Sequence, residues 1–178
     1  TQATTDMNLG VLSDNTRGIM MMGSPSGIQG ILEFITIPTT GNASDFGSVA
    51  PRRHAATMAS PVRSVFCSCK NDTTSAYIKT IDFIITQTGG ESTTFVETVI
   101  ATEQPCGAGN ATRGLIAGGY ISPTGTNNIE FVTIASTGNA TDFGDLNYSK
   151  TSGVGGGSNA TRAIWWGGNA VSYTHLRA

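Results

Sequence analysis

The feature that most constrains the fold of this chain is an internal repeat of about 48 residues. Arginines mark each period at Arg17, Arg63, Arg113 and Arg162, which are 46, 50 and 49 residues apart. An acid–Phe block keeps the same period at Glu33, Asp82 and Glu130. A third block begins at Thr40 and Thr137, with a degraded copy at 88–95. Three blocks that share one period predict a structure of similar units, each stabilised by stacking on its neighbours.

Each period contains about four short segments typical of β-strands. Apolar and polar residues alternate in these segments, and turn residues separate them. The chain also has 23 Gly and is rich in Thr, and both are weak helix formers. We therefore predict a helix-poor, antiparallel all-β structure. The predicted strands lie near 17–22, 31–37, 63–68, 79–86, 113–118, 129–135 and 162–166.

Four-stranded units that recur every 40–50 residues are typical of a β-propeller. The blades are predicted at about 7–49, 53–99 and 103–148, with half a blade at 150–170. A closed ring needs about four to eight blades. Residues 1–170 are therefore predicted to form an open propeller fragment rather than a closed ring.

Several residues in these units resemble the kelch repeat. Gly118-Gly119 and Gly167-Gly168 match its double glycine, and Glu130-Phe131 stands at its acid–aromatic position. Phe46, Phe95 and Phe143 stand where kelch repeats have Trp. The first two units depart from the pattern, because Met22-Gly23 and Ser68-Cys69 replace the glycine pair.

A more specific resemblance comes from the phrases Asn110–Gly114 and Thr137–Gly144, which are similar to kelch-like repeats in tail and virion proteins of marine bacteriophages. This implies a non-enzymatic structural or host-contacting (adhesion) module in a virion or extracellular setting. Its partners would be other blades or domains of a parent protein and a host surface protein or glycan. Residues 171–178 look like a translated sequencing linker and are interpreted as a non-native tail. An intracellular, cytoplasmic kelch-type interaction scaffold is the alternative.

An enzyme is the least favoured reading. Some kelch-type propellers are copper oxidases with a Tyr/His ligand set, whereas His54 is the one histidine outside the predicted tail. We predict no catalytic, cofactor-binding or metal-binding residues. The net charge of −2 gives no electrostatic case for nucleic acid, and no apolar run reaches the 18 residues typical of a membrane span.

The remaining polar and sulfur-bearing positions have simple structural interpretations. Cys67, Cys69 and Cys106 are odd in number, which disfavours a disulfide framework and favours small buried thiols. Six Asn-x-Ser/Thr sequons, including those at Asn110 and Asn159, are either glycosylation acceptors or turn residues, and the turn role is favoured.

The repeated arginines lead to the most specific structural predictions. We expect Arg17 and Arg113 to form ion pairs with Asp45 and Asp142, or with the equivalent turn of an adjacent blade. Arg63 is expected to make a longer contact or none, because Glu91 is its nearest carboxylate. The competing hypothesis places the arginine heads around one ligand channel. Phe46 and Phe143 are predicted to be buried between blades.

Three equivalent loops of variable sequence are predicted between the second and third strands of the units. They span 24–30, 70–79 and 120–128. Loops carry binding residues more often than strands do. Tyr120, Asn127 and Asn128 are therefore the candidate partner-contacting residues.

Overall fold

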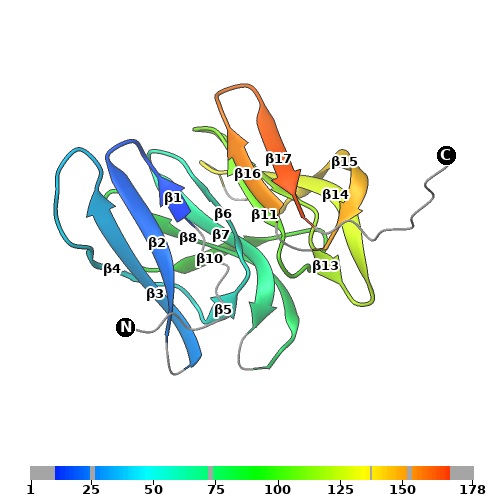
Figure 1. Cartoon of the computed structure of the whole chain (residues 1–178), viewed down its shortest axis with the longest axis horizontal. Helices are drawn as coiled ribbons and strands as arrows, with labels where there is room; N and C mark the ends of the chain where they lie inside the picture. The colour runs from blue at the N-terminus through cyan, green and yellow to red at the C-terminus, as the bar shows by residue number, and fades with distance from the viewer. Residues whose placement is uncertain (1–10, 25–26, 72–73, 137, 152–153, 169–178) are drawn as a thin grey trace.

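The computed structural model describes residues 11–24, 27–71, 74–136, 138–151 and 154–168. These residues form an all-β structure without helices, which includes one curled half-barrel sheet (Figure 1). Each of the seven predicted strand positions falls on an observed strand, so the all-β prediction is confirmed. Residues 171–178 lie outside the described part of the chain.

Sheets one to three are each an antiparallel meander of four main strands. The first contains β1 (Val11–Ser13), β2 (Arg17–Ser24), β3 (Gly27–Thr36) and β4 (Ser44–Ser48). The second contains β6 (Ala56–Ala59), β7 (Arg63–Asn71), β8 (Tyr77–Ile85) and β10 (Thr93–Glu97). The third contains β11 (Cys106–Gly109), β12 (Arg113–Ala117), β14 (Thr124–Thr133) and β15 (Thr141–Lys150). Sheet four is the hairpin of β16 (Val154–Ser158) and β17 (Ala163–Gly167).

Three short strands complete the sheets. β5 (Arg52–Arg53) pairs with β7, and β13 (Tyr120–Ile121) pairs with β14. β9 (Gly90–Glu91) lies in the turn between the third and fourth strands of sheet two, yet it pairs in parallel with β4 of sheet one. This pairing connects the outer edge of one sheet to the next sheet.

The second and third strands pair in the same register in every complete sheet. Arg17 lies opposite Thr36, Arg63 opposite Ile85 and Arg113 opposite Thr133. A register shift by one residue would turn every side chain to the other face of the sheet. The constant register therefore places equivalent side chains on equivalent faces throughout the repeat.

The turn before each repeat arginine is closed by a polar side chain three residues earlier. The side-chain oxygens of Asp14, Ser60, Asn110 and Asn159 each accept hydrogen bonds from two backbone N–H groups of the turn, including that of the arginine. Such side chain to backbone bonds are the reason that these residue types favour turns. The turn interpretation of the sequons is confirmed at Asn110 and Asn159.

The first strands of consecutive sheets contact one another: β1 contacts β6, β6 contacts β11, and β11 contacts β16. Glycines permit this close approach. A Cβ atom added to Gly107 would lie 2.2 Å from the Thr57 carbonyl oxygen, and one added to Gly156 would lie 2.7 Å from the Gly107 carbonyl oxygen. The glycines of β11 and β16 are therefore required for the close packing of these two first strands on their neighbours.

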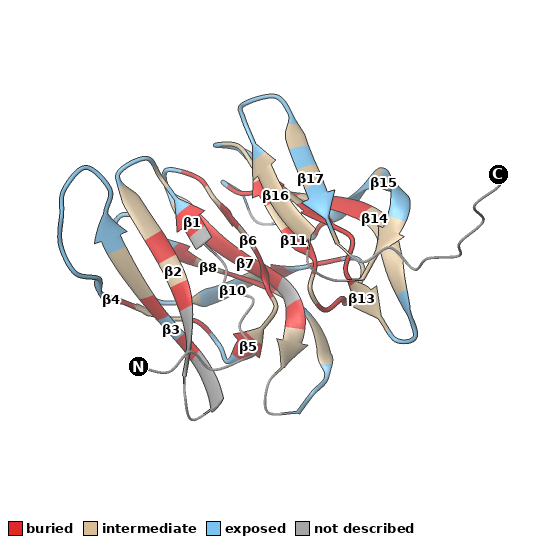
Figure 2. Ribbon diagram, in the orientation of Figure 1, coloured by how far each residue is buried: buried red, intermediate tan, exposed pale blue. Residues whose placement is uncertain are grey.

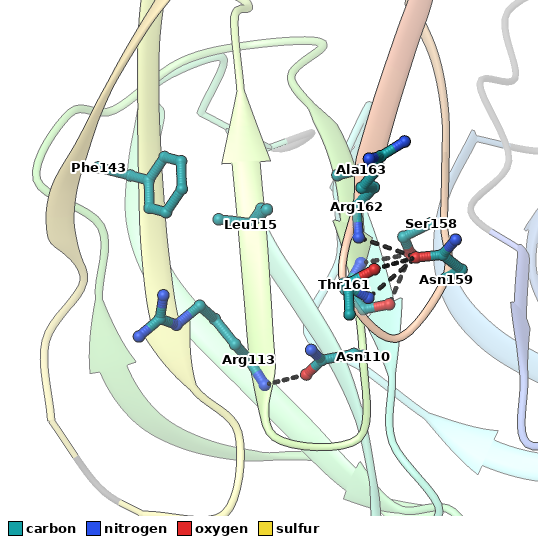
Figure 3. A pocket seen from close by; sticks show the side chains of 10 residues that line it. Asn110, Arg113, Leu115, Phe143, Ser158, Asn159, Thr161, Arg162 and Ala163 are labelled. Carbon is teal, nitrogen blue, oxygen red and sulfur yellow. Dashed lines mark hydrogen bonds between the residues drawn. The ribbon is translucent and has the colours of Figure 1, made fainter.

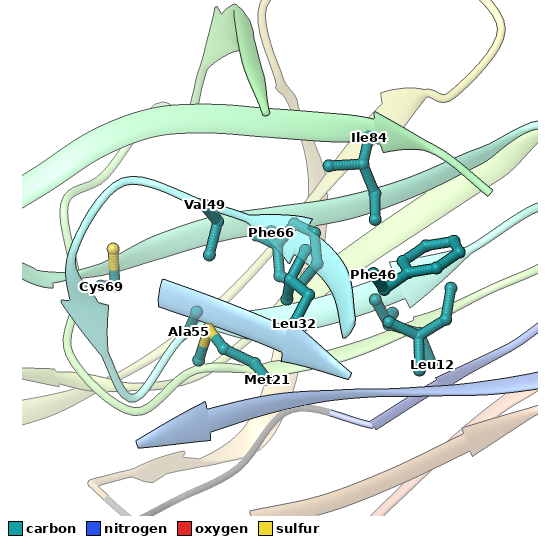
Figure 4. Packing of buried hydrophobic residues seen from close by; sticks show 10 residues of the cluster. Leu12, Met21, Leu32, Phe46, Val49, Ala55, Phe66, Cys69 and Ile84 are labelled. Atoms are coloured by element: carbon teal, nitrogen blue, oxygen red, sulfur yellow. The ribbon is translucent and has the colours of Figure 1, made fainter. Parts of the chain in front are cut away.

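Two hydrophobic clusters fill the spaces between the sheets. In the first, Leu32 and Phe46 of sheet one pack against Phe66 and Ile84 of sheet two (Figure 4). The second joins residues of sheet two, such as Val65 and Ile81, to residues of sheet three, such as Ile116 and Val132. The buried residues accordingly concentrate where sheets face each other, while the hairpin of sheet four is largely intermediate or exposed (Figure 2).

The three predicted variable loops are mostly strand, which corrects that prediction. β3 begins at Gly27, β8 at Tyr77 and β14 at Thr124, so each third strand extends into its predicted loop. The glycine pair explains where sheet three differs from the others. Gly118 and Gly119 have φ angles of 67° and 109°, so β12 ends at Ala117, whereas β2 and β7 continue as longer hairpins. Gly167 and Gly168 repeat this conformation, with φ angles of 73° and 80°.

Candidate functional site

Among the described residues, Arg17, Arg63 and Arg113 form no ion pair with a carboxylate, so the predicted ion pairs of Arg17 with Asp45 and of Arg113 with Asp142 are wrong. Each guanidinium instead lies over the Phe of its own third strand. The distances from Cζ to the ring centroid are 5.9 Å for Arg17 on Phe34 and 4.4 Å for both Arg63 on Phe83 and Arg113 on Phe131. A cation over an aromatic face within about 6 Å is attracted by the ring quadrupole.

Asp45 and Asp142 have local roles that leave the arginines to other acceptors. The Asp45 carboxylate accepts a hydrogen bond from the backbone N–H of Gly47, and the Asp142 carboxylate accepts one from the Asn128 amide. Each carboxylate lies on the fourth strand of the same sheet as its arginine, but not beside that arginine. In the observed register Arg17 lies opposite Thr36, at the end of β3. Asp45 instead lies opposite Glu33, three residues earlier on β3.

Two of the arginines bond to the next sheet. Arg17 Nη1 donates to the Thr86 carbonyl oxygen at 3.2 Å and to Gln87 Oε1 at 3.0 Å. Arg63 Nη1 donates to the Ile134 carbonyl oxygen at 2.8 Å. Thr86 and Ile134 are equivalent positions, each three residues after the third-strand Phe. We call these contacts the inter-sheet arginine bonds. They lie at successive interfaces, so the arginine heads of Arg17 and Arg63 do not converge on one channel.

The third-strand Phe also packs on the fourth-strand Phe in each complete sheet. The ring centroids are 5.1 Å apart for Phe34 and Phe46, 5.3 Å for Phe83 and Phe95, and 6.2 Å for Phe131 and Phe143. The next sheet covers the first pair, and Phe46 is 8% exposed as predicted. Phe143 is 52% exposed, so its predicted burial is wrong. The physical reason is that β16 and β17 cover less of sheet three than sheets two and three cover of their predecessors.

A pocket of about 130 Å³ opens at this incompletely covered face (Figure 3). Arg113, Leu115 and Phe143 line it from sheet three, and Ser158, Thr161 and Arg162 line it from the β16–β17 hairpin. Arg113 is exposed here, whereas Arg17 and Arg63 are half-buried. Arg162 belongs to the same pocket as Arg113 and is also exposed. The pocket therefore gathers two of the four repeat arginines with an exposed aromatic ring.

The acid of the third strand forms a second kind of contact, to the segment that links two sheets. Asp82 forms a buried ion pair with Arg52, which also donates to the Ala50 and Phe66 carbonyls. Glu130 accepts hydrogen bonds from the backbone N–H groups of Val99 and Ile100 at 2.7 and 2.9 Å. Burial raises the pKa of Glu130 above its ordinary value, while these two bonds act in the opposite direction.

A cluster around Glu103 was not anticipated from the sequence. Its carboxylate lies 2.8 Å from His54 Nδ1, 3.5 Å from Lys70 Nζ and 3.9 Å from Arg53 Nε, and the residue is buried. The backbone of Glu103 exchanges two hydrogen bonds with Tyr120. Glu103 lies between repeat blocks, where no periodic signal marks it. The cluster holds the link between sheets two and three against both.

The candidate partner-contacting residues lie in paired strands rather than in a loop. Tyr120 is half-buried on β13. Asn127 Nδ2 donates to the Leu146 carbonyl at 3.4 Å, and Asn128 Nδ2 donates to Asp142 at 3.0 Å, so both amides connect β14 to β15. They occupy the region where the β14–β15 register shifts. Partner contact by these residues stays a prediction.

The surroundings of the three cysteines disfavour the thiolate form. Cys67, Cys69 and Cys106 are free and buried, as predicted. Burial raises the pKa of each thiol, to about 11 for Cys69 and for Cys106, so the nucleophilic thiolate is disfavoured. Within the described residues, no group of three or more His, Cys, Asp or Glu side chains is placed to hold a metal ion.

No family model and no curated protein matches this chain. The described part of the chain contains no helix long and apolar enough to cross a membrane.

Proposed function

We propose that this chain is a non-enzymatic structural repeat module, an open kelch-like β-propeller fragment whose sheets are the blades. We further propose that it contacts a host surface as part of a phage tail or virion protein. The observation that carries the modular part is the inter-sheet arginine bond, made twice from equivalent donors to equivalent carbonyls. A contact that repeats with the sequence period is what a stack of interchangeable units requires.

The contacts between first strands support the propeller arrangement. Successive sheets approach most closely through β1, β6, β11 and β16, and their third and fourth strands lie farther out along each meander. Sheets that radiate from adjacent first strands are the arrangement of propeller blades. The host-contacting role is supported by the sequence resemblance and by the polar, weakly charged composition of the chain, in which 12% of residues are charged.

A binding experiment on fractionated cells tests the host-contacting role. The purified chain, labelled at its N-terminus, is incubated with intact marine bacteria and separately with their cytosolic proteins. We expect saturable binding to intact cells of responsive strains, with competition by unlabelled chain and by isolated surface polysaccharide or envelope protein. Retention by cytosolic proteins without binding to any intact cell would contradict host contact and favour the intracellular scaffold.

A pair of tyrosine variants locates the binding surface in the same experiment. Tyr120→Ala alters the predicted contact region on β13, and Tyr148→Ala alters a 71% exposed ring on β15 as the matched control. We expect Tyr120→Ala to weaken cell binding and Tyr148→Ala to leave it unchanged. The reverse result would move the contact surface to β15.

A further inference from the structure

We propose that the outer edge of β17, together with the adjoining face of sheet three, binds an extended chain segment with the third-strand pattern of this repeat. That pattern is an acid, Phe, a β-branched aliphatic residue, and then two residues drawn from Ile and Thr, as in Glu130–Ile134. The partner is thus a segment that carries this sequence pattern and is not already paired in another β-sheet. This inference deepens the proposed function and rests on its modular part, not on host contact.

The first observation is the unpaired edge of β17. β17 pairs with β16 on one side, and none of the described residues pairs with its other side. The Asn159 N–H donates to the Arg162 carbonyl, so the next residue, Ala163, turns its own N–H and C=O away from β16. Trp165 follows the same alternation. In sheets one to three, the equivalent edges of β2, β7 and β12 are occupied by β3, β8 and β14.

The second observation is the constant register, which fixes how such a segment would pair. The β-branched residue after the third-strand Phe lies opposite Gly18, Ser64 and Gly114 in the three complete sheets. The equivalent residue on β17 is Ala163, the residue after the repeat arginine. The Phe of the segment is then opposite Ile164, and the acid is opposite Trp165.

A backbone hydrogen bond anchors the end of each existing third strand. The N–H groups of Ile37, Thr86 and Ile134 donate to the carbonyls of Thr16, Val62 and Thr112, each at 2.9 Å. These acceptors directly precede the repeat arginines. Thr161 directly precedes Arg162, and its carbonyl is the acceptor that this register assigns to the bound segment.

The third observation is a set of three incompletely satisfied side chains at this face: two are more exposed than their equivalents Arg17 and Phe46, and one has a buried polar atom without a partner. Arg113 is exposed and makes no inter-sheet arginine bond to any described residue, and Phe143 is 52% exposed. The buried Nε1 of Trp165 has no hydrogen-bond partner among the described residues. A bound third strand supplies a carbonyl for Arg113, cover for Phe143, and a carboxylate opposite Trp165.

A folded second copy of this chain does not fit the same site. The exposed outer face of sheet one carries the right pattern, with Ile35 and Ile37 on β3 and just after it. However, β3 is already paired with β2 and β4 on its two edges, so it has no edge to offer to β17. Strand addition requires a segment with free backbone groups.

Tryptophan fluorescence provides a direct test, because the two tryptophans of the chain, Trp165 and Trp166, are both on β17. The probe is a synthetic peptide of residues 126–135, made soluble with terminal lysines, which contains neither Trp nor Tyr. We expect a saturable blue shift on titration of the full chain. The matched control peptide is N-methylated at Ile134, which removes the donor for the Thr161 carbonyl and is expected to abolish the shift.

Protein variants separate the elements of the site. Ala163→Pro removes an edge N–H that β16 does not use, and proline is tolerated at such an edge, so we expect a folded protein without peptide binding. Arg113→Gln is expected to weaken binding about tenfold through loss of a charged hydrogen-bond donor. Arg17→Gln, the matched control at a distant interface, is expected to leave peptide affinity unchanged.

Four results would overturn the inference. These are no shift with a folded chain at saturating peptide, equal binding of the N-methylated peptide, full binding by Ala163→Pro, or a concentration-dependent shift without peptide in step with dimerisation, which would assign the face to a second copy. The modular part of the proposed function is tested separately, by the stability effect of Arg63→Gln described below.

Discussion

Two faces of the molecule present an equivalent set of one Arg and two Phe side chains in different surroundings. One is the interface between sheets one and two, and the other is the face of sheet three toward β16 and β17. At the first, Arg17 bonds to Thr86, and Phe46 lies on Phe34 beneath sheet two. At the second, Arg113 and Phe143 line an open pocket. The repeat therefore supplies the contact residues in every unit, and the neighbouring sheet decides whether they stabilise the fold.

The outer face of sheet one makes the same comparison from the other side. Ile84 and Val132 are each 1% exposed against the preceding sheet, whereas the equivalent Ile35 is 38% exposed. Thr86 and Ile134 are 0% exposed, whereas the equivalent Ile37 is 51% exposed. The same positions thus differ in burial only because one lacks a preceding sheet among the described residues.

Truncation of the fourth-strand Phe gives the largest expected contrast. Phe46→Ala should lower the free energy of unfolding by about 3–5 kcal/mol, because it leaves a cavity in the packed cluster. Phe143→Ala should lower it by less than about 1 kcal/mol, because the ring is half exposed and loses little buried area. Urea denaturation of both variants measures the difference. Equal losses would mean that the face of sheet three is covered in solution.

The acid of the third strand gives the next contrast. Asp82→Asn leaves Arg52 buried without its counter-charge and should destabilise the chain by about 3 kcal/mol or somewhat more. Glu33→Gln changes the equivalent residue in sheet one, which holds no linker among the described residues, and should cost less than about 0.5 kcal/mol. Thermal unfolding followed by circular dichroism compares them. A substantial loss in Glu33→Gln would show that a surface contact of sheet one had been missed.

The repeat arginine gives an intermediate contrast. Arg63→Gln removes the bond to the Ile134 carbonyl and the cation between Phe83 and Phe95, at a cost of about 1.5–3 kcal/mol. Arg113→Gln removes only an exposed guanidinium from the face of Phe131 and should cost about 0.5 kcal/mol or less. Denaturation midpoints of the two variants decide between them. If Arg63→Gln costs no more than Arg113→Gln, the inter-sheet bond does not contribute to stacking.

The turn before the first arginine gives the smallest effect. Burial acts to raise the pKa of Asp14, but hydrogen bonds from the Arg17 and Thr16 backbone and from the Thr16 and Gln87 side chains lower it overall. A folded-state pKa below the unfolded value contributes stability above the unfolded pKa and loses it as the pH falls through the folded pKa. Asp14 is only half-buried, so solvent screening should keep the contribution below about 0.5 kcal/mol.

Asp14→Asn isolates this effect, because Asn110 and Asn159 make the same turn bonds without a charge. We expect the stability of the variant relative to the unaltered chain to be constant near neutral pH and to improve as the pH falls below about 4. Urea midpoints at neutral and acidic pH measure this. If the stability difference between the variant and the unaltered chain does not change with pH, the charge of Asp14 does not contribute to stability.

Much of the architecture was determined by the sequence alone. The period of the arginine, acid–Phe and Thr-Gly-Asn blocks predicted seven strand positions and the turn role of Asn110 and Asn159, because strand alternation and turn chemistry are local properties.

The partners of the repeated side chains were decided only by the tertiary structure. The acceptor for Arg17 is a backbone carbonyl 69 residues away, and every residue carries such a group, so the sequence gives no sign of which one is used. Asp45 is the partner predicted for Arg17, but stacking of sheet two on sheet one places the Thr86 carbonyl beside the guanidinium instead. Phe46 and Phe143 stand in nearly identical phrases and differ in exposure, because burial depends on the neighbouring sheet rather than on the residues that surround each Phe in the chain.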